Sequence, residues 1–321
     1  MPIRNGSQYI SGLRDGREVW YGGEKVADVT KFPQFEAAVR SIAELYDMQH
    51  EPDTRELLVC HSEEVGQEVG RAFQIPRTAD DLRLKREAYF AWAQANCGMV
   101  GRSPDFLNVM LAALAAKKSF FAEDSAERAN NVFEYYRFVA RNDLFMTHAL
   151  LDPQLDKGKL RNEQSDPAIC LQVVDENENG IVLSGIKRIA TAAPYADELL
   201  VWPFPPTFQR GEESYANVFA IPMNTKGLKT ICRPSFSNIG TTRDFPLSSR
   251  FDEMDATVVF EDVLVPWDRV FVYKNVSLLN RMYRDSRMRE LTAHQTNARL
   301  EAKLGFVYAV VQRLAEAQGM E

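Results

Sequence analysis

The spacing of apolar residues changes twice along the chain and divides it into three blocks. Up to about residue 150, apolar side chains recur every three to four positions, which is the period of an amphipathic α-helix, and this block reads as helix throughout. Short apolar runs separated by Pro, Gly and Asn follow and predict β-strands. The helical period then returns. We therefore expect a helical domain over 1–153, a β domain over 154–274 and the beginning of a second helical domain over 275–321.

Helix start signals locate the first two of four helices in the first block. Thr30 and Pro33 mark the beginning of one helix. The next covers 78–96, where Thr78 is the expected N-cap and Asp81, three residues on, completes a capping box.

The third predicted helix opens with Ser103 as N-cap and Pro104 as its first helical residue. It is apolar around most of its circumference, which predicts a central buried helix. The fourth begins at Ser125 and is amphipathic as far as His148, beyond which an Asp-Pro pair breaks the pattern.

The middle block predicts an all-β domain. The segment DENENG is a hairpin-type turn between two apolar runs, and four further β-rich runs follow it: YADELLVWPF, YANVFAIPM, GLKTICRP and ATVVFEDVLVPWDRVF. A helical block followed by a β block and a second helical block predicts an α+β architecture in segregated domains, not a doubly wound sheet. A ligand is expected between these layers.

Composition narrows the class of protein. The 321 residues are 45% hydrophobic and 26% charged, enough for two or three domains, and the net charge of -7 is spread along the chain without a basic cluster. Nucleic acid is therefore not an expected partner. No apolar run approaches the roughly 20 residues of a membrane span, and the N-terminus has no apolar signal core. We expect a cytoplasmic protein.

Several familiar kinds of site are not indicated. The sequence has no GxGxxG, GxxxxGK[ST], GxSxG or HExxH motif. Its four cysteines are far apart and include no CxxC pair, which argues against a disulfide framework and a thiolate metal cage. We therefore expect no metal site.

The stretch GRSPDFLN carries the first candidate for chemistry. Arg102 would place its guanidinium beside the free N–H groups of the helix that Ser103 opens, and two positive potentials at one point suit an oxyanion. The alternative is an ion pair with an acid such as Asp105. Phe106 would lie near the same point as an apolar wall, or serve as plain core.

Two histidines and two polar residues are further candidates. His148 and His294 could each act as a general base or donate a hydrogen bond to a phenol or carboxylate, or could be structural. Gln154 follows a chain break and Thr191 ends a strand, so either could hydrogen-bond a planar heteroaromatic ring. Neither position requires a ligand.

One series of segments runs through the chain in this order: REVWYGGEKVADVT, LYDMQHEP, GRSPDFLN, THALLDPQ, GIKRIATAAPYADE and SSRFDEMDATVVFEDVLVPWDRVF. From about Tyr9 to the last residue, the chain resembles the oxygenase component of two-component, reduced-flavin-dependent phenol hydroxylases, the 4-hydroxyphenylacetate 3-monooxygenase family. The resemblance implies an acyl-CoA dehydrogenase-like fold with a β-barrel-like middle domain. It also implies a C-terminal four-helix bundle that completes the flavin pocket and builds a homotetramer; most of that bundle would be missing here.

The resemblance also implies a reaction. A separate NAD(P)H:flavin reductase supplies FADH2, which reacts with O2 to give a C4a-hydroperoxyflavin. A 4-substituted phenol such as 4-hydroxyphenylacetate is then hydroxylated at its ortho carbon to a catechol, as in aromatic catabolism. This division of labour would explain the missing GxGxxG motif, because the oxygenase need not bind a nicotinamide cofactor.

Residue roles follow from the resemblance position by position. The implied catalytic residues are Arg102, His148 and His294, the implied substrate-binding residues are Arg102, Phe106 and His148, and the implied FAD-binding residues are His148, Ala149, Leu150, Gln154 and Thr191. Some 4-hydroxyphenylacetate hydroxylases have tyrosine at position 106. Phe106 lacks that hydroxyl group, which makes 4-hydroxyphenylacetate itself a less certain substrate.

Three other functions are considered. The chain could oxidise chlorophenols or nitrophenols, or hydroxylate a tyrosyl unit held on a carrier protein. It could also be an inactive, truncated paralogue. An iron–sulfur dehydratase of the same superfamily is disfavoured, because no second cysteine lies between Cys97 and Arg102 and none follows His294.

Overall fold

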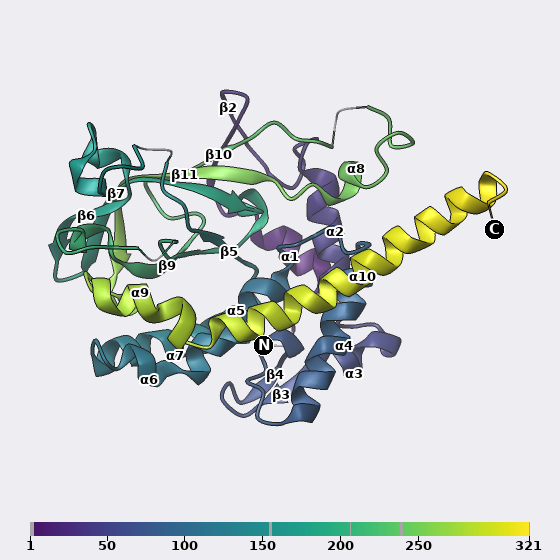
Figure 1. Ribbon diagram of the computed structural model, residues 1–321, viewed down its shortest axis with the longest axis horizontal. Helices are drawn as coiled ribbons and strands as arrows, with labels where there is room; N and C mark the ends of the chain where they lie inside the picture. Colours follow the sequence, from purple (N-terminus) through teal and green to yellow (C-terminus); the bar gives the residue numbers. More distant parts are fainter. Residues whose placement is uncertain (1–2, 154–155, 206, 238–239, 321) are drawn as a thin grey trace.

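The chain folds into two larger β-sheets with most of its helices gathered on one side of them (Figure 1). The computed structural model describes residues 3–153, 156–205, 207–237 and 240–320. Helices dominate the two ends of the sequence and strands its middle. The predicted α+β class is confirmed.

The described helices have the following bounds. The α-helices are α1 (Gly6–Gly12), α2 (Glu36–Asp47), α3 (Pro52–Leu58), α4 (Ala79–Ala95), α5 (Pro104–Ala116), α6 (Lys118–Phe121), α7 (Ala126–Asn142), α8 (Ser248–Phe251), α9 (Val276–Asp285) and α10 (Met288–Ala317). The 3-10 turns are η1 (Arg71–Phe73), η2 (Arg161–Glu163), η3 (Pro167–Ile169), η4 (Ala193–Tyr195), η5 (Glu213–Tyr215) and η6 (Trp267–Arg269).

The strands form three sheets within the described part of the chain. The strands are β1 (Glu18–Tyr21), β2 (Glu24–Lys25), β3 (Val59–Ser62), β4 (Gln67–Gly70), β5 (Met146–Ala149), β6 (Gln172–Asn177), β7 (Gly180–Thr191), β8 (Glu198–Val201), β9 (Val218–Pro222), β10 (Leu228–Cys232), β11 (Asp255–Pro266) and β12 (Val270–Val272). The larger sheets have the orders β2-β1-β10-β11-β7-β6 and β12-β9-β8-β5, and β3 pairs with β4 alone. All pairs are antiparallel except β1 with β10 and β5 with β8.

Helix α5 is the buried centre of the molecule. Every residue from Pro104 to Ala115 is buried, and η1, α7, α10 and β5 contribute to its surroundings. Ser103 and Pro104 occupy the N-cap and first helical positions, as predicted. The capping box of Thr78 and Asp81 at the start of α4 is also confirmed.

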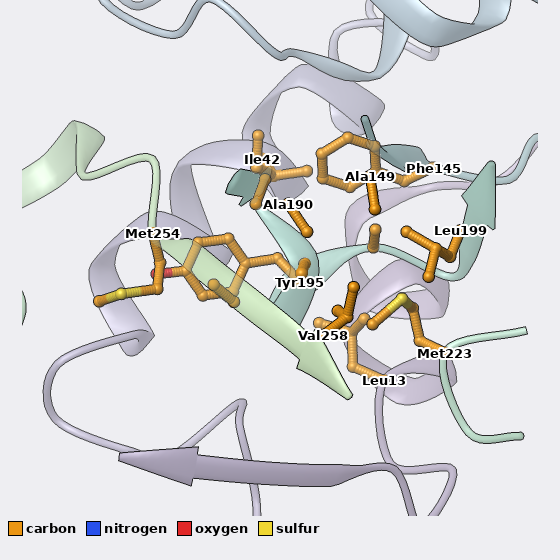
Figure 2. Packing of buried hydrophobic residues seen from close by; sticks show 14 of the residues in the cluster. Leu13, Ile42, Phe145, Ala149, Ala190, Tyr195, Leu199, Met223, Met254 and Val258 are labelled. Atoms are coloured by element: carbon orange, nitrogen blue, oxygen red, sulfur yellow. The ribbon is translucent and has the colours of Figure 1, made fainter. Parts of the chain in front are cut away.

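One of the two large cores joins the first block to the β block. Leu13, Ile42 of α2, Phe145 and Val258 of β11 belong to one apolar cluster (Figure 2). Burying a side chain of this size contributes about 1.5–3 kcal/mol, so the two blocks stabilise each other. The predicted limits near 153 and 274 fall between β5 and β6 and between β12 and α9, and they stay a prediction.

The prediction that the first block is helical throughout is wrong, because this block contains strands β1 to β5. The turn between β1 and β2 is Gly22-Gly23, and both glycines have positive φ angles, 60° and 88°. Two-residue turns between antiparallel strands need positive φ angles, so this glycine pair favours a β-hairpin. Strand β1 then pairs with β10 of the middle block.

Two predicted helix limits are wrong. Helix α2 begins at Glu36, because Thr30 hydrogen-bonds Asp28 in the preceding turn instead of opening the helix. Helix α7 ends at Asn142, because Asp143 closes it in the left-handed conformation with φ 49°. Strand β5 then covers Met146–Ala149.

Helix α10 packs closely on the loop before α5. Gly98 has φ +68°, and a Cβ there would lie 2.6–2.7 Å from the backbone and Cβ of Lys303. Only glycine permits this approach. None of the described helices combines the length and hydropathy that crossing a membrane requires.

We expect Gly98→Ala to lower the free energy of unfolding by at least about 1 kcal/mol, because the new methyl group collides with α10 and the backbone is left-handed. Gly305→Ala is the matched control. Nothing lies within 4 Å of a Cβ at Gly305, so this change should leave stability equal or raise it by up to about 1 kcal/mol. Denaturant unfolding measures both, and equal effects would contradict the close approach.

Candidate active site

Strand β5 brings His148 against the loop that precedes α5. β5 lies at one end of its sheet order and pairs in parallel with β8, with His148 opposite Leu200. All four of its residues are buried. Since β5 also contacts α5, His148 reaches the residue before the N-cap of that helix.

Arg102 and His148 form a hydrogen-bonded pair. Nε of Arg102 donates to Nε2 of His148 at 3.0 Å, and Nη1 donates a longer bond of 3.3 Å to the carbonyl of Gly101. Among the described residues, no carboxylate lies within ion-pair distance of the guanidinium. Arg102 is therefore a partly buried cation that forms no direct ion pair with a described carboxylate.

Aromatic rings enclose the pair. Cζ of Arg102 lies 4.1 Å from the ring centre of Phe106. The His148 ring stacks on Trp202 with centroids 6.1 Å apart and an interplanar angle of 16°, and it lies at 6.2 Å from Phe106. These walls limit water at the pair, which strengthens electrostatic interactions there.

His148 is held as a neutral imidazole. Burial, and then the charge of Arg102, lower its pKa from 6.5 to about 3. Because Nε2 accepts the hydrogen bond from Arg102, the ring proton is on Nδ1, and Nδ1 has no hydrogen-bond partner among the described residues. His148 therefore offers a buried N–H donor. Burial also lowers the pKa of Arg102, but an arginine remains charged at neutral pH.

Asp105 does not pair with Arg102, so that alternative is wrong. Its carboxylate accepts hydrogen bonds from the hydroxyl of Ser103 and from Nε2 of Gln295 on α10, the latter at 3.3 Å. Burial raises the pKa of Asp105, and these two donors act to lower it. Ser103 occupies the N-cap position, but its hydroxyl turns to Asp105 and not to the helix backbone.

The carboxylate of Glu253 partly offsets the positive potential at the start of α5. The backbone N–H of Arg102 donates to Oε1 of Glu253, which lies in the segment between α8 and β11. The expected convergence of free amides and guanidinium is therefore incomplete. The guanidinium itself remains available.

Three of the other predicted residues lie on or beside β5. Ala149 is buried in the core that Figure 2 shows, and the carbonyl of Leu150 accepts from the backbone N–H of Phe204 at 3.1 Å. The Thr191 carbonyl accepts from Thr147, the neighbour of His148 in β5, while its hydroxyl donates to Asp255 at 2.7 Å.

Of the remaining two predicted residues, the structure describes only His294, which is not joined to this group. The ring of His294 packs edge-on against Tyr89 of α4 at 5.8 Å, and burial together with the charges of Lys85 and Arg86 lowers its pKa. No hydrogen bond or ring contact of the described residues links it to Arg102 or His148. Gln154 lies outside the described residues.

Sequence reasoning missed Trp202 and Glu253. Trp202 follows β8, where a strand ends in a Trp-Pro pair, a position at which an indole can face a site. Glu253 lies in the acidic stretch FDEMD ahead of β11. No local pattern links that stretch to a loop 151 positions earlier.

The residues present fit a flavin ring. Backbone groups at the outer edge of β5 and the unpartnered Nδ1–H of His148 are polar groups suited to a planar heteroaromatic ring with carbonyl oxygens. Arg102 beside them suits an oxyanion. These groups are of the kinds that recognise a ring with carbonyl oxygens and a phenolate.

Comparison with known proteins identifies the family of the chain. The family described as 4-hydroxyphenylacetate 3-hydroxylase, N terminal, matches residues 5–272. The chain is 42% identical over its whole length to a 4-hydroxyphenylacetate 3-monooxygenase oxygenase component of Geobacillus sp. (strain PA-9). It is 43% identical, over 99% of its length, to the oxygenase component of that name from Thermus thermophilus. The chain spans about 65% of the length of these two relatives.

A solved structure shows the same fold. It is an oxygenase component of 4-hydroxyphenylacetate 3-monooxygenase complexed with FAD and 4-hydroxyphenylacetate, with a TM-score of 0.91 and 43% identity. The match covers 98% of this chain and 64% of that one. The expected acyl-CoA dehydrogenase-like fold is thereby confirmed.

Replacing His148 by glutamine is expected to reduce the acid sensitivity of stability. The pKa of His148 is about 3 in the folded chain and near the ordinary 6.5 in the unfolded chain, so between these pH values only the unfolded chain binds the proton. The contribution of His148 to the free energy of unfolding is therefore complete above about pH 6.5 and falls by up to about 1.4 kcal/mol per pH unit below it. A glutamine side chain does not titrate, so the variant lacks this pH dependence.

The measurement is the free energy of unfolding between about pH 8 and pH 4, with His50→Gln at an exposed position as control. The control should keep the slope of the wild type. Coinciding slopes for His148→Gln and the wild type would show that His148 is not held neutral.

Proposed function

Because the chain belongs to the 4-hydroxyphenylacetate 3-hydroxylase family, we propose that it acts as the oxygenase component of a two-component, FADH2-dependent monooxygenase. The proposed reaction converts a 4-substituted phenol, O2 and FADH2 to a catechol, water and FAD. One oxygen atom of O2 enters the ring ortho to the hydroxyl group, and the other leaves as water.

The hydrogen-bonded pair of Arg102 and His148 is the observation that carries this proposal. Arg102 is a partly buried cation without a carboxylate partner among the described residues, and His148 has a free Nδ1–H. A phenolate oxygen satisfies the guanidinium, whereas the Nδ1–H of His148 points away from Arg102 and suits a carbonyl oxygen of the flavin ring. Stabilising the phenolate raises the electron density at the ortho carbon, the position that accepts the oxygen atom.

The chain's own residues bind and orient the phenol. Arg102 holds the phenolate oxygen, His148 contributes a neutral donor, and the rings of Phe106 and Trp202 exclude water. His148 accepts a proton poorly, because its pKa is lowered to about 3. The general base predicted at His294 stays a prediction, since that ring faces α4.

Reduced FAD supplies the two electrons that activate O2. His148, Ala149 and Leu150 in and after β5, with Thr191 beside them, are the described residues that would hold its ring. The role of Gln154 rests on the resemblance alone. A separate NAD(P)H:flavin reductase is the proposed partner, and we place both proteins in the cytoplasm, where NAD(P)H is made.

The substrate is proposed to be 4-hydroxyphenylacetate or a close analogue, which the related solved structure contains. Phe106 offers no hydroxyl group to a polar substituent, so chlorophenols and nitrophenols are the second candidate. Product analysis over a panel that includes a carrier-bound tyrosyl substrate separates the alternatives.

We also propose that the chain forms a homo-oligomer, a tetramer by the resemblance. The second half of α10 projects from the body of the molecule (Figure 1). One stripe of it is apolar and exposed: Leu300, Leu304, Val307, Tyr308, Val311 and Leu314. The three- and four-residue spacing is that of a helix packing face, which a further helix would cover.

Arg102→Ala is expected to reduce hydroxylation by about 100- to 1,000-fold, because the donor of a developing oxyanion is lost. The measurement has two stages: anaerobic titration with reduced FAD, then mixing with oxygenated buffer and a phenol, with product counted per flavin oxidised. Exposed Arg40→Ala is the control.

Product per flavin at the wild-type level in Arg102→Ala would refute the role of the guanidinium. A wild-type chain that binds no reduced FAD would favour the inactive paralogue.

Introducing lysine at both Leu304 and Val311 is expected to lower the mass of the assembly in solution, because charge would enter its apolar interface. Light scattering coupled to size exclusion measures that mass. Gln312→Lys adds a charge at a neighbouring exposed position and should leave it unchanged. An unchanged mass in the double variant would show that the stripe is not an interface.

A further inference from the structure

Groups from two distant segments meet at the loop before α5. The backbone N–H of Arg102 donates to Oε1 of Glu253. A Cβ on Gly101 would lie 3.3 Å from Oε2 of Glu253 and 3.7 Å from Cζ of Arg299. Arg299, on α10, donates to the carbonyl of Gly98 at 3.0 Å. The carboxylate of Glu253 thus lies on the backbone side of Arg102, next to a second guanidinium.

Glu253 is itself held in place. Nη2 of Arg233, just beyond β10, donates to the carbonyl of Glu253 at 3.0 Å and to Oδ1 of Asp252 at 2.7 Å. The following residue, Met254, is fully buried in the core shown in Figure 2. Because its backbone is anchored on both sides, Glu253 gives the loop a fixed point of attachment.

The charge of Glu253 is balanced by several groups. Burial raises its pKa, whereas the amides of Gly101 and Arg102 and the positive charges of Arg102 and Arg299 act to lower it. Arg102 and Arg299 repel each other, and the carboxylate offsets that repulsion. The guanidinium of Arg102 still makes its side-chain hydrogen bond to His148 and not to Glu253.

We propose that Glu253 is a positioning residue for the proposed reaction. Its carboxylate fixes the amides of the loop and thereby sets the direction in which the Arg102 side chain leaves the backbone, toward Nε2 of His148 and the phenolate. This assignment rests on the proposed function of Arg102. The role depends on the length of the side chain. An aspartate at position 253 would carry the same charge, but its shorter side chain would leave the carboxylate too far from the loop amides.

Glutamine and aspartate at position 253 separate reach from charge. Glu253→Gln keeps an oxygen that accepts the amides and should bind a phenolate within about 3-fold of the wild type. Glu253→Asp and Glu253→Ala should bind it about 10-fold or more weakly, as expected when the hydrogen bond to the loop amide is lost. The probe is 4-nitrophenol, whose phenolate absorbs visible light, titrated without flavin or oxygen.

A second readout does not depend on phenolate binding. The ¹⁵N resonance of Nε2 in His148 reports the hydrogen bond from Arg102, and it should shift in the aspartate and alanine variants but not in Glu253→Gln. Glu261→Asp and Glu261→Gln are matched controls, because Glu261 is an exposed glutamate paired with Lys229 at 2.6 Å. Both controls should leave the resonance and the affinity unchanged.

The two readouts distinguish the two proposals. If the wild type binds no phenolate, the proposed function fails, and the His148 resonance alone then decides the role of Glu253. If the wild type binds phenolate and Glu253→Asp binds it equally well, the positioning role is overturned while that of Arg102 stands. Weak binding by Glu253→Gln with normal binding by Glu253→Asp would also overturn it. The aspartate variant keeps the charge, so it decides the question if the alanine variant does not fold.

Discussion

The burial of α5 on all sides constrains the rest of the site. A buried helix start needs partners for its polar groups, and water cannot supply them at the centre of the molecule. The partners come from three parts of the chain. Asp105 accepts a hydrogen bond from Gln295 of α10, the backbone of Arg102 donates to Glu253 of the β block, and its side chain donates to His148 of β5. Each contact satisfies a buried group and also fixes the loop. Stability and site geometry therefore depend on the same contacts.

The same arrangement leaves the guanidinium of Arg102 without a direct ion pair among the described residues. Glu253 binds the backbone of Arg102, Asp105 is satisfied by Ser103 and Gln295, and the side chain of Arg102 meets only a neutral imidazole. Partial burial of an unpaired guanidinium is unfavourable, and a bound anion recovers that free energy. A fold that neutralised Arg102 with Asp105 would be simpler and would have no such affinity. Unpaired charge of this kind is typical of functional sites.

The sequence predicted what depends on local patterns. The buried character of α5, the capping box of α4 and the hairpin of β6 and β7 all follow from periodicity and turn residues. Strand β5 was missed because all four of its residues are buried, so no alternation separates it from the helix before it. Arg102 and His148 were each identified as candidates. Their pairing, and the contact with Glu253, depend on segments that only the tertiary fold brings together.

Helix α10 contributes both to the loop before α5 and to an exposed apolar surface. Its first half is packed against α4 and α5 and places Gln295 and Arg299 at the loop, while its second half exposes the apolar stripe that begins at Leu300. Arg299, which bonds the carbonyl of Gly98, directly precedes Leu300 in the helix. The contacts that hold the loop and the start of the exposed stripe therefore lie on the same turn of α10, because one turn of an α-helix contains about 3.6 residues.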